Sequence, residues 1–472
     1  MKTTSELAEQ FEIQLIGSGS VEISSAAISS NHVEPGALFI AVAGANGHGA
    51  DHLDKAIENG AVAVLTDREL ATDLPVLIHP DPRSIAGAVS ASVFDTASTG
   101  LRLFAVTGTN GKTSTAYYLQ QLLTTLGVRV GLSSSAETVF EGNVFQSDLT
   151  TPEAPRIHWL MAKMAELGAS AVVLEVSAQA ISRHRVDGLV FEVAGFTNLS
   201  RDHLDDYGSM QKYLEAKMPL VSPQFCERAV VNVEDVYGHQ MLLASQDHGV
   251  GIGVGLDYQA SFASGQLEIS GKQYLSAEIT LGSLMAKNLA LAVVMLLEAG
   301  FSAQDLSEAL GEVSLDVPGR LQLVSEAKPH VYLDYAHTPA AVEAACAELA
   351  ARYPELTVVL AASGDRDAGK RPEMALAAVK YAKKVVITDQ HPRSEDPAEI
   401  RRSLIVEASK FLSEDALFEA SDPAGAIAKA VEITNESGAI LWCGPGHLTY
   451  REINGEKVPF NAAEIARGVQ DK

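Results

Sequence analysis

Short apolar segments alternate along this chain with longer segments whose apolar residues recur at helical spacing. Near the start of the chain, apolar segments at 38–43 and 61–65 are predicted strands, and residues 52–59 are a predicted helix that ends before Gly60. Further predicted strands follow the same pattern at 171–176, 191–197, 229–233, 331–335, 357–361, 384–388 and 439–443. Strands separated by helices are typical of a mostly parallel sheet covered on both faces. The pattern therefore predicts an α/β fold.

Two polar, turn-rich stretches interrupt this alternation, at residues 94–100 and 316–320. The chain has 472 residues, which is enough for about three domains at ~100–200 residues each. We therefore predict three domains, at residues 1–97, 98–317 and 318–472.

The segment TGTNGKTST at residues 107–115 follows the apolar run 101–106, so a strand leads through a glycine-containing loop into a helix that begins near Lys112. Such a loop directs backbone N–H groups and a helix N-terminus at one point, which makes an anion site. Lys112 adds a positive charge for phosphate, and the Thr113 hydroxyl suits Mg²⁺. The strict spacing of this motif would place glycine where Val106 stands, so a plain glycine turn with a solvated lysine is the alternative. We predict that the loop binds a nucleoside triphosphate.

Polar residues close two further strands of the same predicted domain. Glu175 ends one strand, and Asn198 ends the next, shortly before Asp202 and His203. Ligands of open α/β sheets bind beyond the carboxyl ends of the strands. A carboxylate and an imidazole at that edge suit a divalent cation beside nucleotide phosphates. The alternatives are a strand-end charge facing water for Glu175 and a hydrogen-bonded core histidine for His203.

The third predicted domain has three polar segments next to its strands. Residues 334–339, DYAHTP, end a strand, and Pro339 suits the first position of a helix. Charged residues gather at 364–372 in what reads as a solvated loop. Ser394 is the predicted N-cap of a helix with acidic residues in its first turn. Arg393 has no part in such a cap, and its planar guanidinium suits a carboxylate.

Composition narrows the class of protein. The formal net charge is −25, from 35 basic and 60 acidic residues, which argues against nucleic acid as a partner because phosphate backbones bind basic surfaces. No apolar run approaches the ~18 residues of a membrane span, and the first residues lack the apolar stretch of a signal peptide. Cys226, Cys346 and Cys443 lack metal-site spacing and are predicted to pack as small apolar side chains. We expect a cytoplasmic enzyme with no membrane association, by default a monomer because no large apolar stripe is visible.

Taken in order, these segments resemble the motifs of the Mur ligase family from about residue 25 to the end of the chain. Within that family they are similar to the members that add the third amino acid to UDP-N-acetylmuramoyl-dipeptide. The matching segments are GTNGKTST at 108–115, TTPE at 150–153, EVS at 175–177, Arg185-Val186, FTNL at 196–199, DHLD at 202–205, YLEAK at 213–217, DYAHTP at 334–339, GDRD at 364–367 and KRP at 370–372. So many motifs in one order are more specific than any single one of them.

The resemblance implies a three-domain architecture with a central P-loop-type, mostly parallel sheet and a Rossmann-like C-terminal domain. The N-terminal domain would bind the UDP-sugar, the central domain ATP and Mg²⁺, and the C-terminal domain a free amino acid. ATP would be bound by Gly108, Thr109, Asn110, Gly111, Lys112, Thr113, Ser114, Asn288, Arg320 and Asp334. Mg²⁺ would be bound by Thr113, Glu175, His203 and a carbamylated, anionic Lys217. The UDP-N-acetylmuramoyl-dipeptide and the amino acid would be held by Ser30, Thr150, Thr151, Ser177, Arg185, Lys217 and Arg393.

The chemistry that the resemblance implies is amide formation driven by ATP. A peptide carboxylate is a poor electrophile, so ATP first phosphorylates it, and the amine of the amino acid then attacks the acyl phosphate. The implied catalytic residues are Lys112, Glu175, His203 and Lys217. Positive charge would be placed around the moving phosphoryl group, and closure of the third domain would exclude water.

The chain departs from the family's pattern mainly where the amino acid is selected. Members specific for meso-diaminopimelate carry DNPR where this chain has QHPR at 390–393, and GKGHE where it has GPGHL at 444–448. The distal amino-carboxylate centre of diaminopimelate would thus lack its usual partners, at ~1–3 kcal/mol for each polar group left unpaired. We therefore hypothesise L-lysine or ornithine as the third amino acid, with Glu395 and Asp396 as candidate partners of its side-chain amine.

Three other interpretations stay open at the level of the sequence. One is a member that adds diaminopimelate, another is a different amide ligase such as folylpolyglutamate synthetase, and the third is a nucleotide-binding switch without catalysis. The TTPE segment and the additional N-terminal domain favour a muramoyl substrate. Glu175, His203 and Lys217 favour catalysis, because a protein that only binds a nucleotide needs no second metal site. Milder departures from the pattern are Gln179, Tyr207 and, close to Asn288, Met285.

Overall fold

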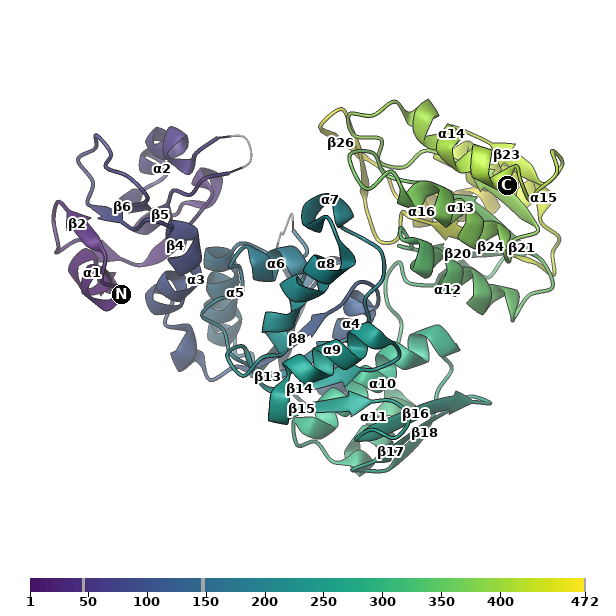
Figure 1. Ribbon diagram of the computed structural model, residues 1–472, viewed down its shortest axis with the longest axis horizontal. Helices are drawn as coiled ribbons and strands as arrows, with labels where there is room; N and C mark the ends of the chain where they lie inside the picture. Colours follow the sequence, from purple (N-terminus) through teal and green to yellow (C-terminus); the bar gives the residue numbers. More distant parts are fainter. Residues whose placement is uncertain (45–46, 146–148, 471–472) are drawn as a thin grey trace.

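The computed structural model describes residues 1–44, 47–145 and 149–470, and in them the predicted α/β fold is confirmed. Three large sheets follow one another along the chain and occupy three lobes, from the N-terminal lobe in purple to the C-terminal lobe in green and yellow (Figure 1). No helix within the described ranges is long and apolar enough to cross a membrane. The three cysteines are free and buried, as predicted.

The first sheet has five strands in the order β2-β7-β6-β5-β4 and is parallel except for the pair β2–β7. Leu38 and Ile40 of β5 enter one apolar core and Phe39 enters another, because alternate residues of a strand face opposite sides of a sheet. The predicted helix at 52–59 is a short α-helix preceded by a 3₁₀ turn. The elements of this lobe are β1 (Lys2–Thr3), α1 (Thr4–Gln10), β2 (Gln14–Ile16), β3 (Glu22–Ile23), β4 (Ser25–Ala27), η1 (Ser30–His32), β5 (Ala37–Ile40), η2 (Gly49–His52), α2 (Leu53–Glu58), β6 (Ala61–Thr66), β7 (Val76–Ile78), α3 (Pro82–Val93) and η3 (Thr96–Thr99).

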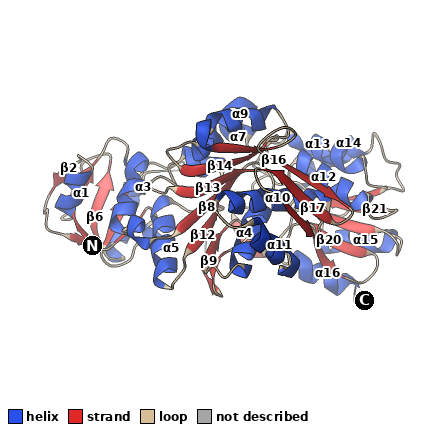
Figure 2. Cartoon of the chain, turned by 90° about the horizontal axis from the view of Figure 1, so that it is seen from below, coloured by secondary structure: helices blue, strands red, loops and turns tan. Residues whose placement is uncertain are grey.

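The central sheet has eleven strands in the order β11-β10-β9-β12-β8-β13-β14-β15-β16-β17-β18. From β9 to β16 the neighbours pair in parallel, and antiparallel strands extend both edges. Figure 2 shows β12, β8, β13 and β14 next to one another in that order. The strands are β8 (Arg102–Thr107), β9 (Val130–Ser133), β10 (Thr138–Phe140), β11 (Asn143–Val144), β12 (Ala171–Glu175), β13 (Phe191–Phe196), β14 (Cys226–Asn232), β15 (Gly249–Ile252), β16 (Tyr258–Ala263), β17 (Gln266–Gly271) and β18 (Leu275–Glu278).

Helices cover both faces of the central sheet because its inner strands place buried apolar residues on both faces. Along β8, Phe104 and Val106 pack in one core with α4, α10 and α11, whereas Leu103 and Ala105 pack in another with α5, α6, α8 and α9. The helices are α4 (Lys112–Thr125), α5 (Ala154–Glu166), α6 (Ala178–Ser182), α7 (Leu204–Tyr207), α8 (Met210–Lys217), η4 (Met218–Val221), α9 (Val236–Ala244), η5 (Gln246–His248), α10 (Ser283–Glu298) and α11 (Ala303–Glu312).

The third sheet has six strands in the order β19-β20-β24-β21-β22-β23, and β19 is the one antiparallel strand among those described. Helices α12 to α14 cover one face, and α15 and α16 cover the other. The elements are β19 (Gln322–Ser325), β20 (His330–Asp334), α12 (Pro339–Ala350), β21 (Leu356–Leu360), α13 (Lys370–Val379), β22 (Lys384–Ile387), α14 (Pro397–Ala408), β23 (Leu417–Glu419), α15 (Pro423–Ile433), β24 (Ala439–Cys443), the hairpin β25 (Tyr450–Ile453) and β26 (Glu456–Pro459), and α16 (Ala462–Gln470).

One predicted helix start is wrong. Helix α14 begins at Pro397 with Asp396 as its N-cap, and the Asp396 carboxylate accepts the N–H of Ala398. Proline fits the first helical position, where no N–H donor is needed, so it sets the start after Asp396 rather than after Ser394. The Ser394 hydroxyl and N–H instead donate to Asp365.

A buried histidine joins the link after the first lobe to the central lobe. His158 of α5 is 0% exposed, and its Nδ1 lies 2.9 Å from the hydroxyl oxygen of Thr96 in η3. Its Nε2 lies 3.0 Å from the carbonyl oxygen of Asp187, which can only accept. Nε2 therefore carries a proton. Burial lowers the pKa of His158 to about 4.

We expect the contribution of His158 to the stability of the folded protein to fall in acid. The pKa of His158 lies below its ordinary value of 6.5, so the unfolded chain binds the proton more tightly than the folded one. Its contribution to stability is complete above about pH 6.5 and is lost as the pH falls towards 4, by roughly 3 kcal/mol in all. Urea unfolding midpoints at pH 7.5 and 5.0 should differ less for His158→Gln than for the wild type. His239→Gln, at an exposed position of α9, is the control and should behave as the wild type. An equal pH dependence in all three proteins would contradict the prediction.

Candidate active site

The predicted phosphate loop lies at the carboxyl end of β8 and leads into α4. Gly108 and Gly111 adopt positive φ angles of 143° and 87°. A Cβ atom at Gly108 would lie 1.9 Å from Oγ1 of Thr197, and one at Gly111 would lie 2.2 Å from Oδ1 of Asn288. Glycine is therefore required at both positions, by backbone conformation and by close packing. No side chain caps the first turn of α4, which leaves its N–H groups available to an anion.

The end of β13 fixes the shape of this loop. The Thr197 hydroxyl donates to the carbonyl of Asn110 at 2.7 Å, and the Asn198 amide donates to the same oxygen at 3.0 Å. In return, the N–H of Asn110 donates to the side-chain oxygen of Asn198 at 3.1 Å. The Thr197-Asn198 pair at the strand end thus supports the loop that the neighbouring strand carries.

Two lysines converge on one carbonyl of the loop. Lys112 Nζ donates to the carbonyl oxygens of Gly108 at 3.2 Å and Thr109 at 2.9 Å. Lys217 Nζ, from α8, donates to the Gly108 carbonyl at 2.9 Å and lies 4.5 Å from the centroid of the Tyr213 ring. Lys217 is 1% exposed, and burial together with the charge of Lys112 holds its pKa well below the usual value. Burial also lowers the pKa of Lys112.

Glu175 ends β12 beside the same loop and is 3% exposed. Its Oε2 accepts the Thr113 hydroxyl at 3.0 Å and the N–H of Ser135 at 2.9 Å, and its Oε1 lies 3.9 Å from Lys112 Nζ. The structure therefore brings together Thr113 and Glu175, two oxygen ligands of the kind that Mg²⁺ prefers. Ser135, in the loop after β9, was not predicted from the sequence.

His203 contacts Gln179 and Asp202. It precedes α7 in a left-handed backbone conformation with φ of 53°. Its Nδ1 accepts the Gln179 amide at 2.8 Å, and its Nε2 lies 3.5 Å from Asp202 Oδ2. Burial lowers the pKa of His203 to about 4, so the ring is neutral at neutral pH. Within the described ranges, no three His, Cys, Asp or Glu side chains gather closely enough to hold a metal ion. The protein side chains thus fit a Mg²⁺ that takes most of its ligands from phosphate and water.

The third sheet presents its carboxyl edge to the phosphate loop. Arg320 donates to the Thr113 hydroxyl at 2.9 Å, and the Thr338 hydroxyl donates to the Asn110 side chain at 3.2 Å. Asp334 accepts the N–H groups of Leu321 and Ala336, both at 2.7 Å. Burial raises the pKa of Asp334. Asp334 therefore orders the segment that carries Arg320.

A buried ion pair strengthens the contact between the central and third lobes. Lys370 Nζ lies 3.0 Å from Asp202 Oδ1, and both side chains are 8% exposed. Burial opposes ionisation of Asp202, yet a hydrogen bond from His337 and the charges of nearby cations hold its pKa well below the usual value. On the surface beside this pair, Arg201 binds Asp367 at 3.1 Å. Removing one partner of a buried pair leaves an uncompensated charge, so we expect the pair to fix the position of the third lobe.

Three of the predicted peptide-binding residues, Thr151, Ser177 and Arg185, form a second cluster at the backbone of Glu175. The Thr151 hydroxyl donates to the Glu175 carbonyl at 2.9 Å and accepts the N–H of Ser177 at 3.1 Å. Arg185 donates to the Thr151 carbonyl at 3.2 Å and pairs with Glu153 at 3.1 Å, and its buried Nε has no hydrogen-bond partner. Such an unsatisfied donor suits an anionic ligand. Thr150 is half-buried next to Thr151.

A bridge from the first lobe to this cluster was not predicted. Arg83 of α3 pairs with Glu153 at 3.0 Å, on the oxygen that Arg185 leaves free. The sequence contains no local signal for a contact across 70 residues. Ser30 stays in the first lobe, where it is buried in η1 and its carbonyl accepts the Asn59 amide at 2.7 Å. Ser30 is thus not part of the cluster around the phosphate loop.

Arg393 is not a free guanidinium. Its Nε donates to Glu452 at 2.9 Å and its NH1 to the Gly364 carbonyl at 2.8 Å. Glu395, expected as a partner for an amine, accepts two hydrogen bonds from Arg371 at 2.8 Å. Asp396 is the N-cap of α14. The half-buried Glu452 on β25 is the carboxylate that pairs with Arg393.

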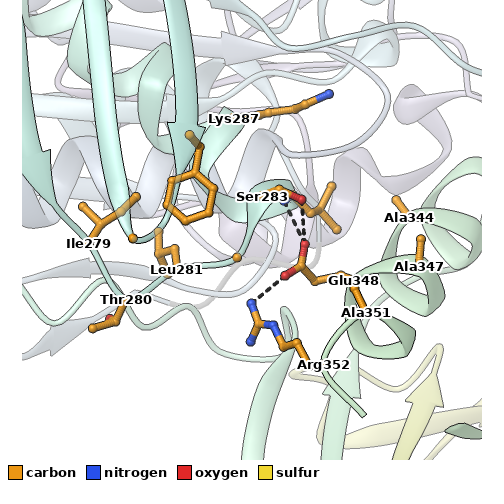
Figure 3. Close-up of a pocket in the computed structure, with 14 residues that line it drawn as sticks. Ile279, Thr280, Leu281, Ser283, Lys287, Ala344, Ala347, Glu348, Ala351 and Arg352 are labelled. Carbon is orange, nitrogen blue, oxygen red and sulfur yellow. Dashed lines mark hydrogen bonds and ion pairs between the residues drawn. The ribbon is translucent and has the colours of Figure 1, made fainter. Parts of the chain in front are cut away.

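A pocket of about 630 Å³ lies between α10, α12 and the loop after β18 (Figure 3), and no residue predicted from the sequence lines it. Figure 3 shows Glu348 of α12 reaching Ser283 and Arg352. Its carboxylate accepts the Ser283 hydroxyl at 2.9 Å and the N–H of Leu284 at 3.2 Å. A helix of the third lobe thus caps α10, the helix that carries Asn288. The pocket is a gap beside this contact, and its lining includes no residue of the phosphate loop.

Comparison with known proteins gives a consistent result over the length of the chain. Residues 22–96 match the profile of the Mur ligase family catalytic domain, 106–296 that of the Mur ligase middle domain, and 319–446 that of the Mur ligase glutamate ligase domain. A UDP-N-acetylmuramyl-tripeptide synthetase of Leifsonia xyli subsp. xyli is 41% identical over 95% of this chain and 91% of its own. A UDP-N-acetylmuramoyl-L-alanyl-D-glutamate–2,6-diaminopimelate ligase of Aquifex aeolicus is 33% identical, over 94% of this chain and 92% of its own.

A solved structure extends the likeness to three dimensions. A UDP-N-acetylmuramoyl-L-alanyl-D-glutamate–2,6-diaminopimelate ligase superimposes with a TM-score of 0.69 at 26% identity, over 100% of this chain and 99% of its own. The arrangement of all three lobes is therefore shared with that protein.

We expect Gly111→Ala to abolish nucleotide binding. The new Cβ would meet Asn288, and the positive φ costs roughly 1–2 kcal/mol for a residue with a side chain. Gly127→Ala, just beyond the other end of α4, is a matched control because its φ is also positive, at 78°, with nothing within 4 Å of the new Cβ. Thermal unfolding with and without an ATP analogue and Mg²⁺ measures the effect. The wild type and Gly127→Ala should be stabilised by the analogue, and Gly111→Ala should not. A full shift in Gly111→Ala would refute the crowding argument.

Proposed function

Because this chain belongs to the Mur ligase family, we propose that it is the ATP-dependent ligase that attaches the third amino acid to UDP-N-acetylmuramoyl-L-alanyl-D-glutamate in peptidoglycan synthesis. The observation that carries this proposal is the convergence of Lys112 and Lys217 on the Gly108 carbonyl, beside the pair Thr113–Glu175. The positive charge of Lys112 and oxygen ligands at one loop suit the transfer of a phosphoryl group. The relative named a tripeptide synthetase supports the position of the added residue.

We further propose that the chain has three domains, at residues 1–97, 98–317 and 318–472, and that each binds different substrates. The first would bind the UDP-sugar with Ser30, and the second would bind ATP and the dipeptide. Its peptide-binding residues would be Thr150, Thr151, Ser177 and Arg185. The orphaned Nε of Arg185 supports a carboxylate or phosphate ligand there. The third domain would bind the free amino acid through Arg393.

The reaction would take place in two steps. A carboxylate oxygen of the dipeptide attacks the γ-phosphorus of ATP, the bond to the β,γ-bridging oxygen breaks, and ADP leaves. The amine nitrogen of the amino acid then attacks the acyl carbon, the bond to phosphate breaks, and the nitrogen loses a proton. Lys112 would stabilise charge on the phosphoryl oxygens, and Arg320 would approach from the third lobe. Mg²⁺ held by Thr113 and Glu175 would supply further neutralisation of that charge.

Lys217 would act as a carbamate. Carbamylation joins the neutral Nζ to CO₂ with loss of one proton, and a protonated amine cannot react. The buried position of Lys217 and the nearby charge of Lys112 lower its pKa and so favour the neutral amine. The product is an anion next to Lys112, and the charge of Lys112, which disfavours a protonated Lys217, would stabilise that anion. It would also provide the second anionic oxygen ligand that the described side chains lack.

We expect Lys217→Ala to lower ligation about 100-fold or more, comparable to the loss of one electrostatic contact to a transition state. Lys212→Ala, at an exposed position of the same helix, is the control and should retain activity. Phosphate release with ATP, Mg²⁺, the UDP-dipeptide and an amino acid measures turnover. Removal of CO₂ from the buffer should slow the wild type and leave the residual rate of Lys217→Ala unchanged. Undiminished turnover of Lys217→Ala would remove the carbamate from the mechanism.

For the third amino acid we propose L-lysine or ornithine. Gln390 and His391 stand where diaminopimelate-specific members have Asp and Asn, and both are committed to internal contacts. A Cβ at Gly444 would lie 1.9 Å from the Gln390 side-chain oxygen, and His391 Nδ1 accepts the N–H of Glu452 at 2.9 Å. Arg393 and Glu452 together carry no net charge. An amino acid with one carboxylate and a side-chain ammonium can therefore match each of them with an opposite charge.

Diaminopimelate is the second candidate, because several relatives at 33–35% identity are named as diaminopimelate ligases. Its distal carboxylate would need a further cation. Arg451, which precedes Glu452 on β25, is a candidate for that cation, but its Nε already donates to the Gln390 carbonyl at 2.7 Å. Arg451 is also half-buried, and burial lowers its pKa. We therefore rank diaminopimelate below a basic amino acid with a single carboxylate.

We expect lysine or ornithine, added singly, to support phosphate release and meso-diaminopimelate to support little. Glu452→Gln should raise the KM for the preferred amino acid up to about fivefold, since the half-exposed carboxylate that would pair with its side-chain ammonium is removed at ~1 kcal/mol or less. Glu456→Gln, exposed at the turn of the same hairpin, should leave KM unchanged. Ligation of diaminopimelate alone would overturn the choice of substrate. No release with any of the three would point to another amide ligase, and folate-type carboxylates would be tested next.

A further inference from the structure

His447 belongs to the third lobe, but its imidazole contacts the central lobe. It lies in the segment 444–448 after β24, where this chain departs from the family's pattern. Its Nε2 is 2.9 Å from the carbonyl oxygen of Ser135, and its Nδ1 is 3.4 Å from NH1 of Arg320. The ring also packs 5.4 Å from the ring of Tyr335. One side chain thus touches residues from both lobes at the edge of the phosphate loop.

The two hydrogen bonds define the protonation state of this ring. The Ser135 carbonyl can only accept, so Nε2 carries the proton, and the Arg320 guanidinium can only donate, so Nδ1 accepts. A neutral imidazole satisfies both partners at once. Burial, and then the charge of Arg320, lower the pKa of His447 to about 4, so this form is the one present at neutral pH.

Both partners of His447 in turn hold residues of the candidate active site. Ser135 donates its N–H and its hydroxyl to Glu175, at 2.9 and 3.1 Å. Arg320 donates to Thr113 at 2.9 Å. One residue, Ser135, therefore stands between His447 and Glu175, and one residue, Arg320, stands between His447 and Thr113.

The backbone of the segment is fixed as firmly as the ring. A Cβ atom at Gly319 would lie 2.3 Å from the backbone nitrogen of His447. A Cβ atom at Gly446 would lie 2.7 Å from the Tyr335 Cβ, and Gly446 has a positive φ of 50°. Close packing at these two glycines leaves the segment little room to move, so the imidazole has a defined position.

We propose that His447 is a positioning residue that couples the amino-acid side of the third lobe to Glu175 and Thr113. By binding Ser135 and Arg320 together, it aligns the oxygen pair with the phosphate loop when the third lobe is docked. This role rests on the proposed function for the identity of the reaction. Its effect on nucleotide binding does not depend on which amino acid is ligated.

The first test is steady-state kinetics of His447→Ala and His447→Gln. His447→Ala should lower kcat about tenfold and raise the KM for ATP, with the KM for the UDP-dipeptide unchanged. His447→Gln should recover most of the loss, because its side-chain N–H₂ can still donate to the Ser135 carbonyl. His330→Ala, at the opposite end of β20 from the phosphate loop, is the control and should resemble the wild type. Wild-type kcat and KM in His447→Ala, or no recovery in His447→Gln, would overturn the proposal.

A second test needs no turnover. Thermal unfolding is measured with and without an ATP analogue and Mg²⁺ for the same variants. His447→Ala should unfold near the wild-type temperature without nucleotide and gain less than half of the wild-type stabilisation with it. A lower unfolding temperature combined with full stabilisation by the analogue would make the role purely structural and overturn the proposal. If the wild type binds the analogue but ligates none of the three amino acids, the proposed function fails while this test still decides the role of His447.

Discussion

The tight packing of the phosphate loop is the constraint on which the rest of the active site depends. The loop backbone is enclosed by the end of β13, by Asn288 of α10 and by the third lobe. Two of its positions have no room for a side chain. A loop held in this way fixes the uncapped first turn of α4, so the N–H groups of that turn can meet an anion without reorganisation. The lysines that bind its Gly108 carbonyl depend on the same geometry.

Burial gives the charged groups around this loop their chemical character. Lys217 loses its usual preference for a proton because it is desolvated next to another cation. Asp202 keeps its charge in a similarly buried place because His337 and Lys370 lie next to its carboxylate, at 3.6 and 3.0 Å. The first arrangement favours covalent modification of an amine, and the second favours attachment of a lobe. A buried group thus loses its charge beside a like charge, as Lys217 does, and keeps it beside an opposite charge, as Asp202 does.

Contacts between lobes, rather than within them, complete the site. Arg320, Thr338 and His447 all reach the central lobe from the third sheet, and Arg83 reaches Glu153 from the first. Each lobe alone therefore lacks some of the side chains that form the candidate site. Under the proposed function, nucleotide, peptide and amino acid would meet where these lobes meet. Within the third lobe, the half-buried Arg393–Glu452 pair likewise joins two segments far apart in sequence, the loop before α14 and the hairpin β25–β26.

The sequence by itself determined the alternation of strands and helices, the phosphate loop and the polar strand ends at Glu175, Asn198 and Asp334, because these features depend on local periodicity and on the carboxyl edge of a parallel sheet. Only the tertiary structure decided which distant groups share them. Ser135 meets Glu175 across 40 residues, and His447 meets Ser135 across 312. A hydrogen-bonding side chain in one sequence does not specify its partner, since many donors and acceptors are chemically equivalent until folding places one pair within reach.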